Sequence, residues 1–286
     1  MRKIGKFLVK CKWMQKCANV NFLNWCTMPK TWIVIGVMSV FSLWNLSGVF
    51  EYSVESGIRC TPFIYPHFFS MPVMCLVYGF LTIALFSDAP FHNAFSDFLK
   101  IRTGNRIWII GQCLFVVEVS LVYSLAYFLL SVIMILPRII VIKQWGTLIE
   151  LFAFDSEAAS HLTGICFTGS IIKEYTPIKA TLLTIAFVWL VSCFLGMLIL
   201  MCRIVFGGHV GSAVSGVFVF LAYFCVFIGN LVFGSSIYKI SPVSWINIDV
   251  FRGGDYPDLM YRFSFLITGI IISIIVGSLI YEKKGL

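Results

Sequence analysis

Apolar residues in this sequence occur in long continuous runs rather than in an alternating pattern. Six runs are long enough to cross a bilayer, since a spanning helix needs about 20 mainly apolar residues. They are residues 32–50, 68–86, 107–131, 180–201, 212–233 and 263–281. Runs without the two-residue alternation of a membrane barrel are typical of helices. The pattern therefore predicts an all-α integral membrane protein with six transmembrane helices.

The composition agrees with a membrane domain and excludes several other classes. Of the 286 residues, 59% are hydrophobic and 12% are charged, whereas soluble proteins average about 25% charged residues. Such a chain is neither disordered nor a soluble enzyme. Among its ten cysteines, only Cys60 and Cys166 fall in segments expected to face outward. A disulfide between these two is one alternative, and free thiols that pack as small apolar side chains are the other.

The distribution of Lys and Arg orients the predicted spans, because these residues concentrate on the cytoplasmic side of membrane proteins. With the N-terminus inside, 13 of the 21 basic residues and three of the 13 acids lie in cytoplasmic segments. The outer segments, 51–67, 137–179 and 234–262, hold eight basic residues and nine acids. We therefore expect both termini to be cytoplasmic.

Residues 1–30 form a basic segment before the first span, and we expect an amphipathic helix there. Phe7 belongs to an apolar stripe at helical spacing, while Lys3, Lys6 and Lys10 lie mostly off that stripe. Such a helix lies in the inner membrane interface with its lysines toward anionic headgroups. A basic tail that only sets topology is the alternative. Residues 31–286 then form the transmembrane domain.

The cytoplasmic segment 87–106 predicts a short helix between the second and third spans. Pro90 suits its first turn, and Gly104 can end it. Phenylalanines recur on one face of this helix, which therefore needs a cover: the bilayer, the rest of the chain or a cytosolic partner. The residues of this face and of its basic end are Phe91, Phe95, Phe98, Leu99, Lys100 and Arg102.

Glu118 is the one ionisable residue deep in a predicted span. Such residues are costly in lipid and generally face the protein interior or a water-filled cavity. On the same helix, Gln112, Tyr123 and Tyr127 share another polar arc, so protein should largely enclose this span. These four residues are candidates for a transport pathway. A hydrogen-bonded structural glutamate between helices is the alternative interpretation of Glu118.

Sequence motifs of common enzymes are absent. The sequence contains no G-x-x-x-x-G-K-[ST], no H-E-x-x-H and no G-x-S-x-G. The four histidines are far apart, without cysteine or carboxylate at ligand spacing, so we expect no metal site. Membrane topology explains the basic charge without a nucleic-acid partner. We therefore predict no catalytic residues and no cofactor in this chain.

The layout of the chain resembles the membrane permease subunit of an ABC exporter, of the ABC type-2 permease family. Four features carry the resemblance: the basic segment 1–30, the junction SDAPF…FLKIRTGNRIWIIGQ at 87–112, the short loop after the fourth span, and an outer segment with Pro242 and Trp245 before the last span. In that family the helix after the second span is a coupling helix that docks on a separate P-loop ATPase, and two permeases pair.

The resemblance implies an ATP-driven exporter whose ATP and Mg²⁺ are bound by the partner ATPase. It implies docking through the phenylalanine-faced helix, a second permease copy with a homodimer favoured over a heterodimer, and a multi-pass place in a bacterial cytoplasmic membrane. The exported substrates it suggests are amphipathic or antimicrobial peptides, as in phenol-soluble-modulin exporters. The competing interpretations are an ion- or proton-coupled carrier centred on Glu118 and, last, a membrane-embedded enzyme.

Overall fold

The computed structural model describes residues 2–91, 94–162, 164–249 and 256–284. Helices make up 82% of the protein, and the described residues contain no strand. Among the described residues, five helical segments are long and apolar enough to cross a membrane. The predicted helical fold, with several helices suited to a membrane, is therefore confirmed.

The helices fall into bundle elements and short connecting elements. The bundle helices are α1 (Arg2–Thr27), α2 (Pro29–Ser56), α3 (Pro72–Phe86), α5 (Asn105–Ile135), α9 (Pro177–Phe206), α10 (Val210–Phe224) and α12 (Leu259–Lys284). The connecting α-helices are α4 (Ala94–Thr103), α6 (Thr147–Phe154), α7 (Ser156–Ser160), α8 (Gly169–Glu174) and α11 (Asn230–Phe233). The remaining turns are η1 (Tyr65–His67), η2 (Leu136–Arg138), the π-helical η3 (Cys225–Gly229), η4 (Ser235–Ile240) and η5 (Pro242–Ile246).

Proline begins three of the bundle helices. Pro29, Pro72 and Pro177 occupy the first position of α2, α3 and α9. The ring presets a helical φ, and the missing N–H removes a donor that the first turn would not use. At the junction of α4 and α5, Gly104 has φ +85°, a conformation that favours glycine. The sharp change of direction between these two helices therefore depends on that residue.

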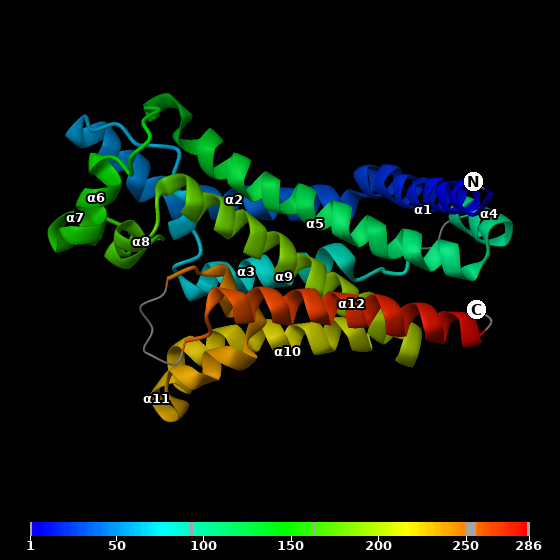
Figure 1. Cartoon of the computed structure of the whole chain (residues 1–286). Helices are drawn as coiled ribbons and strands as arrows, with labels where there is room; N and C mark the ends of the chain where they lie inside the picture. Colours follow the sequence, from blue (N-terminus) through cyan, green and yellow to red (C-terminus); the bar gives the residue numbers. More distant parts are fainter. Residues whose placement is uncertain (1, 92–93, 163, 250–255, 285–286) are drawn as a thin grey trace.

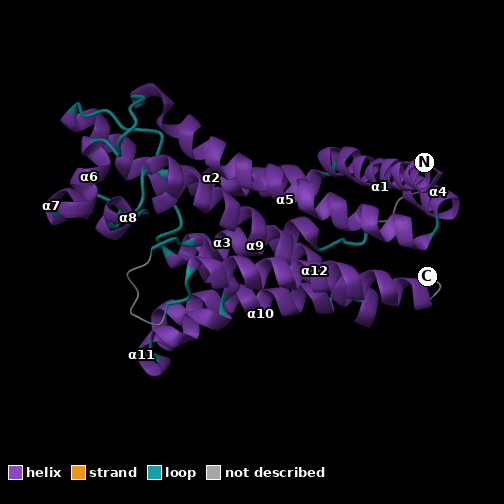
Figure 2. Cartoon of the chain, viewed as in Figure 1, coloured by secondary structure: helices purple, strands orange, loops and turns teal. Residues whose placement is uncertain are grey.

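The bundle has two distinct ends, with α9 near its centre (Figures 1 and 2). Both termini lie at one end, beside α4, whereas α6, α7, α8 and α11 lie at the other (Figure 1). α9 contacts α3, α5, α10 and α12, and 67% of its most apolar window is buried inside the protein. The corresponding share is 22% for α10 with α11 and 17% for α12. These last two helices therefore present most of their apolar surface outward.

α3 is shorter than the span predicted at residues 68–86. It begins at Pro72 and has 15 residues, which at 1.5 Å per residue is about 22 Å. The residues just before it form turns instead, because η1 folds the chain back and Ser70 N–H bonds to the His67 carbonyl at 3.1 Å. The sequence is apolar on both sides of Pro72, so its pattern did not indicate where α3 begins.

Cys60 and Cys166 do not form the disulfide considered from the sequence. Neither residue belongs to a disulfide, and Cys60 is buried while Cys166 is exposed. The Cys60 backbone instead pairs with the segment after α5: its N–H donates to the Arg138 carbonyl at 3.0 Å, and its carbonyl accepts from Ile140 at 2.8 Å. The structure therefore contains the alternative without a disulfide.

Candidate docking site at the end that carries both termini

α4 is a ten-residue helix at the end of the bundle that carries both chain termini (Figure 1). Its described part begins at Ala94, and residues 92–93 of the helix expected from Phe91 lie outside the described residues. Phe91 precedes the described helix and is buried, with its ring 4.9 Å from that of Phe115 and perpendicular to it. Leu99 is buried as well. The expected single apolar face is therefore divided, with part of it directed into the protein.

Three large apolar side chains of α4 remain exposed. Phe95 and Phe98 are 59% and 56% exposed, and Ile101 is 86% exposed. They follow one another at intervals of three residues, so they lie along one side of the helix. Ile101 was not predicted from the sequence as a member of this face. We refer to Phe95, Phe98 and Ile101 as the exposed α4 stripe.

The two predicted basic residues of α4 contact aromatic rings of neighbouring helices. Lys100 Nζ lies 5.7 Å from the ring centre of Trp108 on α5 and 5.3 Å from that of Tyr281 on α12. The Arg102 guanidinium lies 5.1 Å from the ring of Trp13 on α1. Cation–π contacts of this kind are worth about 0.5–1 kcal/mol at exposed sites. The basic residues therefore join α4 to three other helices.

Gln112 on α5 holds the segment just before α4. Its Nε2 donates to the Phe91 carbonyl at 3.1 Å, and its Oε1 accepts from the Phe91 N–H at 3.2 Å. One buried side-chain amide thus satisfies both backbone groups of one residue. Gln112, a predicted pathway residue, therefore links α5 by two hydrogen bonds to the segment that leads to α4.

Glu118 faces α1. It is half-buried, and its Oε1 accepts a hydrogen bond from Gln15 Nε2 at 2.7 Å. Gln15 also donates to Asn19 one helical turn further on, at 3.0 Å. The Glu118 side chain therefore has a polar partner at the contact between α1 and α5.

Tyr123 and Tyr127 belong to a closed aromatic cluster in the core. The Tyr123 ring stacks on Tyr78 at 5.6 Å and meets Tyr127 at 5.2 Å. Tyr65 and Phe69 extend the cluster toward η1, and all five side chains are buried. Tyr123 and Tyr127 therefore pack in the core between α3 and α5. The polar arc predicted on α5 places their hydroxyl groups in this core.

α1 packs across α5 at the same end of the bundle (Figure 1). Cys17, Ala18 and Asn21 are buried on its protein-facing side, whereas Lys10 is exposed. The side chains of Lys3, Lys6 and Phe7 lie outside the described residues. The helix predicted for the basic segment is thus present, and one of its sides contacts protein.

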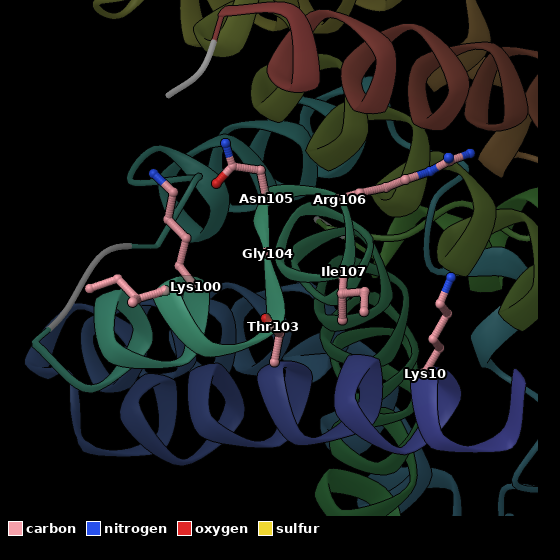
Figure 3. Close-up of a pocket in the computed structure, with 8 residues that line it drawn as sticks. Lys10, Lys100, Thr103, Gly104, Asn105, Arg106 and Ile107 are labelled. Atoms are coloured by element: carbon pink, nitrogen blue, oxygen red, sulfur yellow. The ribbon is translucent and has the colours of Figure 1, made fainter. Parts of the chain in front are cut away.

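A groove of about 810 Å³ opens where α1, α4 and α5 meet. Figure 3 shows the side chains around it, with Lys10 extending from α1 and Lys100 from α4. The α4–α5 turn and the first residues of α5 complete the lining. The lining residues are Lys10, Lys100, Ile101, Thr103, Gly104, Asn105, Arg106 and Ile107.

Polar contacts at this end also tie α3 to α2 and α9. Lys30 Nζ lies 2.5 Å from Asp88 Oδ2 and 3.1 Å from Ser87 Oγ. The Arg203 guanidinium donates to the Ser87 carbonyl at 2.9 Å. Within the described part of the chain, Lys30–Asp88 is the one salt bridge. As a partly exposed pair it adds about 0–1 kcal/mol, so its main effect is to fix where the α3–α4 segment begins.

No group of three or more His, Cys, Asp or Glu residues that could hold a metal ion occurs among the described residues. In comparisons with known proteins, no family model, no curated protein and no solved structure matches this chain. The geometry of the chain is therefore the basis for proposing its function.

Proposed function

We propose that this chain is the membrane permease subunit of an ATP-driven exporter and that α4 docks on a separate P-loop ATPase. The observation that carries the proposal is the exposed α4 stripe of Phe95, Phe98 and Ile101. It lies outside the long apolar helices, at the end with both termini (Figure 1). An exposed apolar helix face is a common element of helix-in-groove recognition between proteins.

The proposal requires an even number of membrane crossings. Both termini lie at one end of the bundle, whereas five spans would place them on opposite sides. We therefore count α3 as a sixth span. Its 15 residues are fewer than the usual 17–25, a difference that tilt of neighbours and local thinning of the bilayer accommodate at modest cost. The end with α1 and α4 is then cytoplasmic.

Contacts of α4 supply a route by which a bound ATPase would move the spans. Gln112 joins the preceding segment to α5 through Phe91. Lys100 contacts aromatic rings of α5 and α12. A displacement of α4 would thus be passed to two long helices, which is what alternating access by movement of packed helices needs.

Three further parts of the proposal follow the resemblance. The substrate class is an amphipathic or antimicrobial peptide, and the membrane is a bacterial cytoplasmic membrane. A second copy of the permease would complete the pathway, which agrees with the small buried share of α10 with α11 and of α12. ATP and Mg²⁺ would be bound by the ATPase partner.

Co-purification with an ATPase tests the proposal. The chain is co-expressed with candidate P-loop ATPases and purified in mild detergent. We expect a complex with ATP hydrolysis, and loss of that complex in Phe95→Asp. Phe154→Asp is the matched control, because Phe154 is 58% exposed at the other end of the bundle.

Two results would overturn the proposal: the ATPase fails to co-purify with the unchanged chain, or Phe95→Asp keeps the complex and its ATP hydrolysis. Transport by the purified chain without any ATPase would favour the carrier interpretation instead.

A further inference from the structure

We infer that the groove between α1, α4 and α5 binds the phosphate of an anionic phospholipid headgroup. The inference needs a chain embedded in a membrane and does not depend on an exporter function. It starts from the side chains that line the groove, which are described above and drawn in Figure 3.

The lining of the groove is cationic. Lys10, Lys100 and Arg106 come from three different helices, and the lining residues that the structure describes include no acid. Lys10 and Arg106 are exposed, and the one salt bridge of the described residues lies elsewhere, at Lys30–Asp88. Three cations spread along an 810 Å³ groove, with no carboxylate among its described lining residues, leave positive charge that an anion can neutralise.

The ends of two candidate spans indicate that the groove lies at the level of lipid headgroups. One span begins at Asn105, which lines the groove, and another ends at Tyr281. Lys100 lies over the buried rings of Tyr281 and Trp108, and a lysine near the end of a span extends its ammonium group toward the headgroups. A ligand at this level is part of the bilayer surface.

The groove also offers apolar surface beside the charges. Ile101 and Ile107 belong to the lining, and Ile101 is 86% exposed. A free phosphate ion would make no use of these side chains. A phospholipid would use both features, with its phosphate near the cations and its glycerol and first methylene groups against the isoleucines.

The arrangement in Figure 3 suits an extended headgroup better than a compact ion. Lys10 and Arg106 extend on one side of the α4–α5 turn, and Lys100 extends on the other. The backbone N–H groups of the first α5 residues have no partners within the helix, and they add the positive end of the helix dipole to the same lining.

Native mass spectrometry of the purified full chain tests the inference. The chain is released from nanodiscs that contain equal amounts of phosphatidylglycerol and phosphatidylcholine, and bound lipids are counted. We expect phosphatidylglycerol to remain bound preferentially. The double variant Lys10→Gln/Arg106→Gln should lower this affinity roughly tenfold or more, since each basic residue near an anionic surface contributes about fivefold.

Lys12→Gln/Lys143→Gln is the matched control. It removes the same charge from two exposed residues that do not line this groove, and it should keep the lipid. A parallel arm adds millimolar inorganic phosphate or glycerol 3-phosphate. Equal retention of the two lipids, unchanged binding in the Lys10/Arg106 variant, or displacement of the lipid by free phosphate would overturn the inference.

Discussion

Gln15 and Glu118 are 103 residues apart in sequence and share a hydrogen bond of 2.7 Å between Nε2 and Oε1. The bond joins α1 to the interior of α5, the longest helix of the bundle. A carboxylate within an apolar helix is therefore satisfied by the N-terminal helix that lies across it. This contact makes α1 part of the packed protein.

Removal of this bond should reduce stability, and the loss should depend on both partners. Hydrogen bonds to charged groups contribute about 1.5–3 kcal/mol. In a double-mutant cycle, Gln15→Ala and Glu118→Ala should therefore show a coupling energy of about 1–3 kcal/mol in denaturant unfolding of the detergent-solubilised chain. Strictly additive effects would contradict the contact.

Glu118→Gln separates a structural role from proton coupling. The amide keeps an oxygen acceptor for Gln15, so we expect unchanged transport with ATPase present and a loss of about 1 kcal/mol in stability. Abolished transport at normal stability would support the carrier that the sequence also allowed. Purified variants reconstituted in vesicles provide both measurements.

Gln112→Ala should loosen the segment that precedes α4. Both backbone groups of Phe91 would lose their bond to Gln112, and each lost hydrogen bond of this kind costs about 0.5–1.5 kcal/mol. We expect faster proteolytic cleavage before α4 and a drop in thermal stability. Gln144→Ala is the control, because Gln144 is exposed near the opposite end, and it should leave both measurements unchanged.

Gly111 sets the close approach of α1 to α5. A Cβ added there would lie 2.5 Å from Cys17 Cβ and 3.1 Å from the Met14 carbonyl oxygen. Gly111→Ala should therefore cost about 1–3 kcal/mol through overpacking. Gly36→Ala on α2 meets nothing within 4 Å and should be neutral or stabilise the helix by up to about 1 kcal/mol. Equal effects of the two changes on unfolding would refute the close contact.

His67 should make the stability of the far end of the bundle depend on pH. Burial lowers the pKa of this imidazole to about 3. Its Nδ1 accepts from the Thr168 N–H at 3.3 Å, with the Phe167 ring at 4.8 Å. The unfolded chain, with a pKa near 6.5, binds the proton first as the pH falls. Stability is therefore complete above pH 6.5 and falls below it, by about 2 kcal/mol at pH 5.

Comparison of unfolding at pH 7.5 and pH 5 checks this dependence. His67→Gln removes the titrating group, so the difference between the two pH values should shrink by about 2 kcal/mol. His161→Gln serves as the control at an exposed histidine. An undiminished difference in His67→Gln would assign the pH dependence to other groups.

Features that depend on neighbouring residues in the chain could be predicted from the sequence. Continuous apolar runs identified the long helices, and Gly104 correctly marked the boundary between α4 and α5. The start of α3 was predicted four residues too early, since Phe68 and Phe69 are as apolar as a span but fold into turns. Their burial comes from contact with Tyr127 across the core, which no local pattern records.

By itself, the sequence determined that this is a helical membrane protein, because apolar length and the lack of charge act within each segment. The tertiary structure decided which side chains of α4 and of the segment before it are exposed, since Phe91 and Leu99 are buried while Phe95 and Phe98 are not. It likewise decided that Glu118 meets α1. Such partners lie far apart along the chain, and only packing brings them together.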